Sequence, residues 1–315
     1  MNVTVIGLGL IGGSVLKALN ASGHQVTGYD TDPETREAAG AESFTTADSI
    51  GAAVEGRDLV VLAVPLPALP PIIDGLKDFP GLITDVTSVK GPVRDLSTSL
   101  PRFVGGHPMA GRETSGFAAS EATLFTGCSW VLCLEPGETS LDDWRTLATL
   151  FTELAARVIP ITAHEHDRAV AQVSHVPHLF ATALSGQLRD NPLAGTLAAG
   201  SFRDGTRVAA TRAELIAAMC GGNASAVGAE LDRLISELHD VRLLLDAPDP
   251  VAALVPALRP AVDLRRAWPA EAGDVVELPI EFEPLLELGR AGGWVAAVNR
   301  ETVEAIRPET DRNRS

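Results

Sequence analysis

Cysteine, aromatic residues and positive charge are all scarce in this chain of 315 residues. It has three cysteines and no CxxC pair, and an odd number cannot form a fully paired disulfide framework, which favours a reducing compartment. Aromatic residues make up only 4%, so the core must be built mainly from Ala, Leu and Val. We therefore expect a cytoplasmic protein without structural disulfides.

The shortage of positive charge limits the partners that the protein can bind. Lys and Arg number 25 against 41 Asp and Glu, which gives a formal net charge of −16. Nucleic acids and anionic lipid headgroups attract clustered Lys and Arg, so we expect neither nucleic acid nor membrane as a partner. Apolar runs long enough to span a bilayer are also lacking. A small anionic substrate is compatible with this charge, because a few Arg, His and amide groups in a cleft can outweigh the overall field locally.

The chain is long enough for two domains, and its first part has the pattern of a parallel sheet. Residues 1–160 alternate short apolar runs with helix-like segments, as βαβ units do. The run DLVVLAV at 58–64 is apolar after its first residue, as expected for a central strand buried on both faces. Further strands are expected at Val3–Ile6, Gln25–Tyr29, Leu82–Asp85, Phe103–Gly106, Trp130–Leu134 and Val158–Ile161, the last of which closes the sheet. These features predict an α/β Rossmann-type dinucleotide-binding domain.

The character of the sequence changes after residue 160. Thr162 and Glu165 fit a capping box at the start of a helix. Helix formers then dominate residues 161–249, and the Ala- and Leu-rich stretch from Arg212 to Leu245 is apolar enough to bury more than one face. We expect an all-α dimerisation and substrate domain here, and a homodimer formed through it. Residues 250–315, which contain several prolines, are expected to form a small C-terminal extension.

A glycine motif directly follows the first expected strand. The residues Gly7-Leu8-Gly9-Leu10-Ile11-Gly12 form a GxGxxG pattern that opens a helix. In such a motif the first glycine permits a tight turn, the second lets the backbone approach a pyrophosphate, and the third allows close helix–strand packing. The helix N-terminus then offers amide groups and a positive dipole end to the phosphates.

Other residues complete the expected cofactor site. Asp30 ends the second strand, 18 residues after Gly12, where a carboxylate accepts hydrogen bonds from the ribose hydroxyls and repels a 2′-phosphate. The nearest following Arg is Arg36, so NAD is favoured over NADP. Val64 and Pro65, at the end of the 58–64 strand, are assigned to the same site. The sequence thus predicts NAD as the cofactor.

Three further clusters carry groups suited to catalysis. TSVKG at 87–91 and GGHPMAGRE at 105–113 each follow an expected strand, so they lie at the carboxyl ends of strands, where clefts form. His107 lies between Gly and Pro in such a loop, and a histidine there is suited to take a proton at neutral pH. SHVPH at 174–178 lies in the first long helix, where His175 and His178 face the same side and Pro177 should bend the helix.

Taken together, these motifs resemble those of the prephenate/arogenate dehydrogenase family of tyrosine biosynthesis. The matching segments are GLGLIGGS, DVTSVKG, GGHPMAGRE, SHVPH and FRDGTRVA, which occur in that family's order from residue 6 to about 209. The resemblance implies an NAD-dependent dehydrogenase that oxidatively decarboxylates prephenate to 4-hydroxyphenylpyruvate. Oxidation of arogenate, which carries an ammonium group in place of the keto group, is the alternative.

The resemblance also implies roles for individual residues. His107 would hydrogen-bond the ring 4-hydroxyl of the substrate and act as the base, and Ser88 would orient His107 and contact the nicotinamide end. Arg207 would hold a substrate carboxylate, while His178 would contact the substrate's side-chain end with His175 nearby. The acidic residues of an ionic network around the mouth of the cleft would be Glu113 and Asp204. The family usually has an Asp-Pro pair and a Trp after TRVA, whereas this chain reads ATRAEL at 210–215.

Three other interpretations of the motifs compete with this one. A 3-hydroxyacid or 6-phosphogluconate dehydrogenase would place a catalytic Lys on the first interdomain helix, but no Lys follows Lys90. Metal ligation would have to use the histidines and Asp167 between residues 164 and 178, yet His164 and His166 do not share a helical face and HExxH is missing, so no metal is expected. A non-catalytic NAD-sensing protein would need the glycine motif but not the catalytic set.

Overall fold

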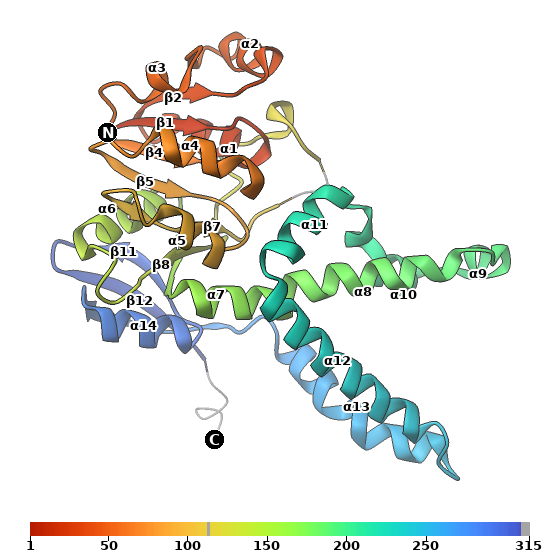
Figure 1. Ribbon diagram of the computed structural model, residues 1–315. Coiled ribbons are helices and arrows are strands. Elements are labelled where there is room, and N and C mark those ends of the chain that lie inside the picture. Colours follow the sequence, from red (N-terminus) through yellow and green to blue (C-terminus); the bar gives the residue numbers. More distant parts are fainter. Residues whose placement is uncertain (112–113, 310–315) are drawn as a thin grey trace.

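The computed structural model describes residues 1–111 and 114–309, which form two six-stranded sheets and a group of projecting helices (Figure 1). The first sheet has the order β3-β2-β1-β4-β5-β6 and all its neighbouring strands are parallel. This is the doubly wound order of dinucleotide-binding folds, with its switch point between β1 and β4. The α/β Rossmann-type prediction is therefore confirmed.

The elements of the first sheet follow one another as βα units. Its strands are β1 (Asn2–Ile6), β2 (Gln25–Tyr29), β3 (Thr45–Thr46), β4 (Leu59–Leu62), β5 (Leu82–Asp85) and β6 (Phe103–Val104). Its helices are α1 (Leu10–Ala21), α2 (Pro33–Ala41), α3 (Ile50–Val54), the short 3₁₀ turn η1 (Leu66–Ala68), α4 (Leu69–Gly75) and α5 (Gly91–Ser97).

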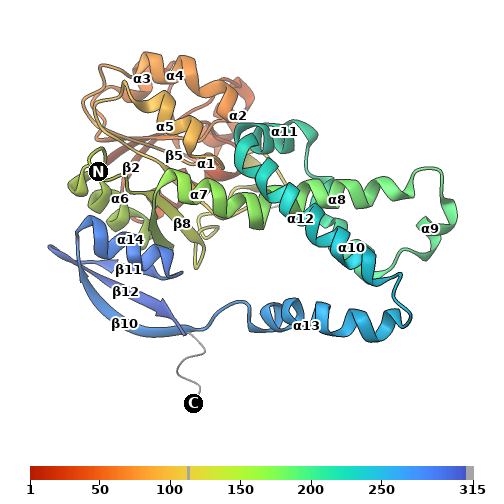
Figure 2. The ribbon, with the colours of Figure 1, turned by 60° about the horizontal axis from the view of Figure 1, so that its bottom comes forward.

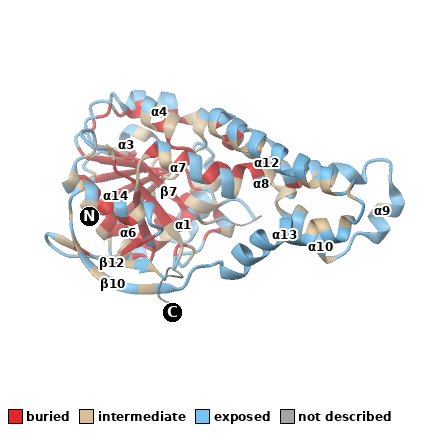
Figure 3. Ribbon diagram, turned by 90° about the horizontal axis from the view of Figure 1, so that it is seen from below, coloured by how far each residue is buried: buried red, intermediate tan, exposed pale blue. Residues whose placement is uncertain are grey.

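Strand β4 is buried on both faces, as its sequence predicts. Leu59 and Val61 belong to one apolar cluster, and Val60 and Leu62 belong to another on the opposite face of the sheet. A strand covered by helices on both sides has no polar face, which explains the uninterrupted apolar run. Figure 3 shows that buried residues gather in the lobe that contains the sheets.

The second sheet contains segments that lie far apart in the sequence. Its order is β10-β12-β11-β9-β8-β7, with β8 and β9 parallel and the other pairs antiparallel. The strands are β7 (Gly106–Pro108), β8 (Ser129–Cys133), β9 (Arg157–Ile161), β10 (Ala272–Pro279), β11 (Trp294–Val298) and β12 (Thr302–Pro308). They are accompanied by the 3₁₀ turn η2 (Phe117–Ala119) and the helices α6 (Leu141–Glu153) and α14 (Phe282–Arg290).

The last fifth of the chain differs from the small appended unit expected for residues 250–315. Its first part is the helix α13 (Pro250–Ala267), and its second part adds β10, β11, β12 and α14 to the second sheet (Figure 2). Contrary to the prediction, β9 is not the last strand of its sheet. Val295 pairs with Val158, so β11 lies beside β9 and extends the sheet. Leu285 and Val303 pack in the same buried cluster as Trp130, because β12 belongs to the same sheet as β8 and α14 packs against that sheet.

Helices make up the part of the chain between the strands β9 and β10. They are α7 (Ala163–Val170), the π-helical segment η3 (Ala171–His175), α8 (Val176–Ser185), η4 (Gly186–Leu188), α9 (Pro192–Leu197), α10 (Gly200–Thr206), η5 (Arg207–Ala210), α11 (Ala213–Gly222), α12 (Ala224–Leu244) and α13. The Thr162–Glu165 capping box is present at the start of α7, as predicted. Within the described ranges, no helix has the length and apolar character that crossing a membrane requires.

The helices form two arms that project from the sheets. In Figure 1 one arm runs along α8 toward α9, and the other consists of α12 and α13 side by side. Pro177 lies at the start of α8 and has no N–H to donate, and the five residues of η3 immediately before α8 are π-helical. His175, the last residue of this segment, is fully buried.

Candidate active site

The glycine turn lies between β1 and α1, at the switch point of the first sheet. Gly7 has φ +94°, a conformation that favours glycine, and a Cβ at Gly12 would lie 1.8 Å from the Gly7 carbonyl oxygen. The backbone roles expected of these two glycines are thus confirmed. Gly9 is exposed, a Cβ added to it would meet no atom within 4 Å, and it caps α1 without a side-chain hydrogen bond. The first amide groups of α1, on Leu10 and Ile11, therefore face an open surface that suits a pyrophosphate.

Asp30 is fixed beside this turn at the end of β2. Its Oδ2 accepts a 2.7 Å hydrogen bond from Leu8 N, and its Oδ1 accepts one of 3.0 Å from Asp32 N. Arg36, six positions along the chain, nevertheless reaches back and donates to the Asp30 carbonyl oxygen at 2.7 Å. The carboxylate is half-buried and its remaining lone pairs suit the hydroxyls of an adenosine ribose. These residues fit a dinucleotide whose ribose carries no 2′-phosphate.

Three other residues near the turn have different surroundings. Val64 packs against Gly7, since its Cγ1 lies 2.9 Å from where a Cβ would be, and Pro65 begins the η1 turn. Gly13 does not face the open surface, because a Cβ there would lie 2.8 Å from Phe117 and from Ser120. Gly13 therefore allows the segment around η2 to pack closely on α1.

A buried Lys–Asp pair joins the end of β5 to the start of β7. Lys90 Nζ is paired with Asp85 and donates a 2.6 Å hydrogen bond to the Gly106 carbonyl oxygen. Asp85 Oδ1 accepts a 3.1 Å bond from Gly106 N. Both charged side chains are almost wholly buried, so each depends on the other for compensation. The pair fixes the backbone immediately before His107, a role that no motif in the sequence indicates.

His107 lies at one end of a series of polar contacts. Its Nδ1 lies 2.8 Å from Nε2 of His166, and Nδ1 of His166 lies 2.8 Å from Oδ1 of Asp167. Burial lowers the pKa of His107 well below its ordinary value, and the charges of His166 and Lys90 act in the same direction. His166 is thus a side-chain partner of His107 that the family resemblance did not imply, and the role of Ser88 in orienting His107 remains a prediction.

His175 lies next to the loop that contains Ser88. Asn223 Nδ2 is 3.2 Å from Nδ1 of His175 and also donates a 2.7 Å hydrogen bond to the Asp167 carbonyl oxygen. Burial lowers the pKa of His175 to about 4, while its contact with the backbone of Ser88 acts in the opposite direction. The structure thus brings residues 88, 107, 166 and 175 together at the carboxyl end of the parallel strands.

The residues assigned to the substrate lie farther along the helices. His178 on α8 is half-buried, and its Nδ1 lies 2.8 Å from the Ser174 carbonyl oxygen. Arg207 begins η5, which packs against α8, and Asp204 is exposed on α10. Glu113 lies outside the described residues. The convergence of Arg207 and His107 on one substrate remains a prediction.

Several residues of this site are not predicted from the sequence. The motifs do not single out Lys90, Asp85 or Asn223, and they suggest His166 and Asp167 only as metal ligands. The adjacent pair His166-Asp167 directly after a capping box is the available signal, because a carboxylate beside a histidine is a frequent orienting partner.

Two family models match the chain. Residues 15–160 match "Prephenate dehydrogenase, nucleotide-binding domain", and residues 162–255 match "Prephenate dehydrogenase, dimerization domain". The prephenate dehydrogenase of Bacillus subtilis is 32% identical over 264 residues, which cover 78% of this chain and 71% of that protein. The prephenate dehydrogenase of Lactococcus lactis is 34% identical over 223 residues, but these cover 66% of this chain and only 60% of that protein.

A solved structure is similar as well. Prephenate dehydrogenase from Aquifex aeolicus, in complex with hydroxyphenyl propionate and NAD⁺, superposes with a TM-score of 0.76 at 27% identity. The match covers 84% of this chain and 96% of that one. The likeness therefore includes both the parallel sheet and the helical part.

Proposed function

The chain belongs to the prephenate dehydrogenase family, and we propose that it catalyses the NAD-dependent oxidative decarboxylation of prephenate to 4-hydroxyphenylpyruvate. The observation that carries this proposal is the position of His107 and Ser88. Both follow strands of the parallel sheet and lie at the same edge as the Gly7–Gly12 turn. A base and a dinucleotide turn at one edge are what a dehydrogenase requires.

The cofactor site is proposed to consist of Gly7, Leu8, Gly9, Leu10, Ile11, Gly12, Asp30, Val64, Pro65 and Ser88. The free amide groups at the start of α1 would hold the pyrophosphate, and the Asp30 carboxylate would accept hydrogen bonds from the ribose hydroxyls. When bound, NAD⁺ supplies the acceptor for the hydride that leaves the ring carbon of the substrate.

His107 is proposed to act as the base. It takes the proton of the ring 4-hydroxyl as the hydride leaves, and this proton returns to the ring oxygen when that oxygen becomes a phenol hydroxyl. Its lowered pKa keeps the imidazole unprotonated at neutral pH, which is the form a base needs. The ring carboxylate departs as carbon dioxide, and its bonding electrons complete the aromatic ring, which makes the reaction strongly favourable.

The substrate would be held by the helical part of the chain. The Arg207 guanidinium is suited to pair with a carboxylate through charge-assisted hydrogen bonds. His178 and His175 are proposed to line the side-chain end, with Asp204 and Glu113 at the mouth. Because prephenate is a dianion and the protein carries a net charge of −16, these local cationic and amide groups must overcome the overall repulsion.

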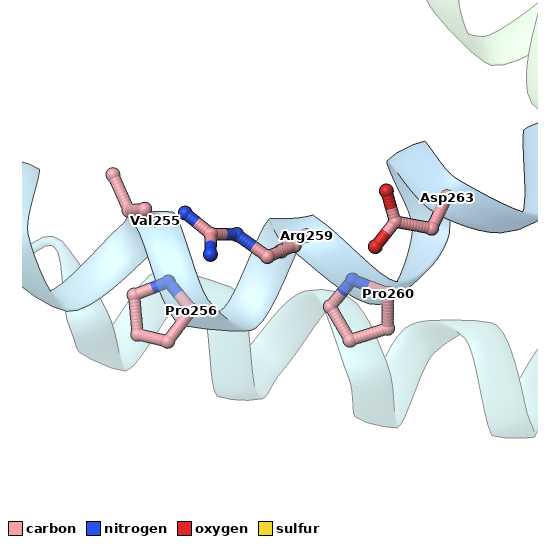
Figure 4. A pocket seen from close by; sticks show the side chains of 5 residues that line it. All are labelled: Val255, Pro256, Arg259, Pro260 and Asp263. Atoms are coloured by element: carbon pink, nitrogen blue, oxygen red, sulfur yellow. The ribbon is translucent and has the colours of Figure 1, made fainter. Parts of the chain in front are cut away.

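We also propose that two copies associate through the helical arms. Large apolar side chains are exposed there: Leu197 exposes 71% of its surface, and Val251 and Leu264 each expose 74%. The surface of α13 also has a shallow pocket, which is lined by Val255, Pro256, Arg259, Pro260 and Asp263 (Figure 4). Light scattering after size-exclusion chromatography should give twice the mass of one chain. A monomer at micromolar concentration would contradict this assembly.

The three cysteines, Cys128, Cys133 and Cys220, are free thiols, which supports the proposal of a cytoplasmic location.

The activity is tested by steady-state kinetics with NAD⁺ and either prephenate or arogenate. We expect NADH to form with prephenate, together with one equivalent each of 4-hydroxyphenylpyruvate and carbon dioxide. A much higher kcat/KM with arogenate than with prephenate would show that arogenate is the substrate. If neither compound is oxidised, the proposed function is wrong.

A further inference from the structure

His166 is placed between a carboxylate and the proposed base. Its side chain is fully buried in α7, with Nδ1 2.8 Å from Asp167 Oδ1 and Nε2 2.8 Å from His107 Nδ1. The rings of His107 and His166 meet edge to face, at an interplanar angle of 74°. The two rings and the carboxylate therefore form one continuous hydrogen-bonded chain that ends at Nε2 of His107.

The carboxylate of Asp167 is fixed as an acceptor. Its Oδ1 accepts a 2.8 Å hydrogen bond from Lys90 N, and its Oδ2 accepts one of 2.8 Å from Gly91 N. Burial alone would raise the pKa of Asp167, but hydrogen bonds from His166 and from these two amides outweigh it and lower the pKa. Asp167 is thus an anion at neutral pH and has no proton to donate.

The positions of the protons along the hydrogen-bonded series Asp167–His166–His107 follow from this fixed acceptor. Asp167 requires a proton on Nδ1 of His166, so a neutral His166 presents the lone pair of Nε2 to His107. His107 must then carry its own proton on Nδ1. The remaining nitrogen of His107, Nε2, is left with a lone pair, which is the form in which it can accept a proton.

We propose that His166 and Asp167 are positioning residues that hold His107 in its Nδ1-protonated tautomer and stabilise the imidazolium that forms when Nε2 takes up a proton. This inference rests on the proposed function, in which His107 is the base. The logic is that of a carboxylate that orients a catalytic histidine, except that here a second imidazole lies between the two groups.

Other charged groups lie near the two imidazoles and affect how readily each of them takes up a proton. Lys90 and His175 disfavour a proton on His107, whereas Asp167 and Asp85 favour one on His166. Loss of the Asp167 charge alone should therefore make protonation of the coupled imidazoles less favourable. The acid limb of the kcat/KM profile would then move to lower pH.

Substitutions of His166 test the kinetic part of the proposal. His166→Phe removes the acceptor and should lower kcat on the order of 10²-fold, with the KM for NAD⁺ nearly unchanged. His166→Gln retains an oxygen that can accept from His107 Nδ1, so it should recover most of the lost kcat. The matched control is His164→Phe, an exposed position on the same helix that should behave as the wild type does. A kcat for His166→Phe within about twofold of the wild-type value would overturn the proposal.

The pH profile separates a positioning role from a merely structural one. Asp167→Asn should shift the acid limb of kcat/KM to lower pH, whereas simple loss of packing would lower kcat/KM at every pH without moving the limb. A profile with an unmoved acid limb would contradict the role of the carboxylate.

Nitrogen-15 NMR of the histidine rings tests the tautomer without any turnover. The signal of His107, assigned by its loss in His107→Asn, should show a protonated Nδ1 in the wild type and a protonated Nε2 in His166→Phe. If the wild type does not oxidise prephenate, the proposed function fails but this measurement still decides the tautomer. If the wild type is active and His107 carries its proton on Nε2, the inference fails on its own.

Discussion

The backbone N–H of Leu8 donates a 2.7 Å hydrogen bond to Oδ2 of Asp30, which joins the glycine turn after β1 to the end of β2. The same carboxylate therefore fixes the turn proposed to hold the pyrophosphate and is also the group proposed to bind the ribose. An acidic residue with both roles would affect the binding of a dinucleotide and also the choice between NAD and NADP.

Asp30→Asn should weaken the binding of NAD⁺ and reduce the discrimination against NADP⁺. Asparagine can still accept the hydrogen bond from Leu8 N, but it lacks the charge that strengthens bonds to the ribose and repels a 2′-phosphate. The KM for NAD⁺ is expected to rise roughly 10-fold, the effect of losing a charge-assisted hydrogen bond. Steady-state kinetics with both cofactors measure this, and the control is Asp32→Asn, which keeps a good cap for α2. An unchanged ratio of kcat/KM for the two cofactors would argue against a role for Asp30.

Gly12→Ala should destabilise the fold severely. A Cβ at this position would lie 1.8 Å from the Gly7 carbonyl oxygen and 2.8 Å from the Ala63 side chain, so the backbone itself would have to move. The free energy of unfolding, measured with urea, should fall by about 3 kcal/mol or more. Gly40→Ala is the matched control, because Gly40 is an exposed position in α2 with open space around it, and that change should stabilise by up to about 1 kcal/mol. Equal effects of the two substitutions would show that the close approach is not as described.

Arg207→Ala should chiefly raise the KM for prephenate. Loss of a charge-assisted pair with a carboxylate corresponds to an increase of roughly 10- to 100-fold, while the KM for NAD⁺ should change little. Arg203→Ala is the control, since Arg203 is an exposed arginine one turn earlier whose Nε lies 3.9 Å from Asp204 Oδ1. The assignment of Arg207 is wrong if both variants have the same KM for prephenate.

Acid should destabilise the protein through His175. The pKa of this buried imidazole is lowered from its ordinary 6.5 to about 4, so the unfolded chain binds a proton more readily than the folded one. The resulting stability is complete above pH 6.5 and is lost as the pH falls from 6.5 toward 4, by on the order of 3 kcal/mol. His175→Asn, which can still accept from Asn223, should reduce the pH dependence of the free energy of unfolding over this range, and the lowered pKa values of His107 and His166 account for the part that remains. The exposed control His164→Asn should leave the slope unchanged.

The parts of this structure that the sequence predicts are those encoded by neighbouring residues. The turn from Gly7 to Gly12, the buried run at 58–64 and the capping box at Thr162 each depend on a few consecutive positions, and the structure has all three. Even the position of Asp30 follows from one strand–helix–strand unit.

Contacts between distant segments were not predictable in this way. His107 and His166 are 59 positions apart, and Val158 pairs with Val295 across the whole helical part. The short runs that became β10 and β11 have strand character, but nothing in a single sequence says which edge they will join. The contact of Arg36 with the Asp30 carbonyl was not predictable either, although the two residues are only six positions apart. It forms because the turn at Asp32 brings Arg36 back toward Asp30.

His107→Asn shows whether His107 is the base of a prephenate-oxidising site. Turnover of NAD⁺ with prephenate and the dissociation constant of NAD⁺ should both be measured on this variant and on the wild type. If His107 is the base, kcat should fall by about 10²- to 10⁴-fold, the usual contribution of a general base, while the dissociation constant of NAD⁺ stays nearly the same. A variant that keeps wild-type turnover would show that His107 is not the base.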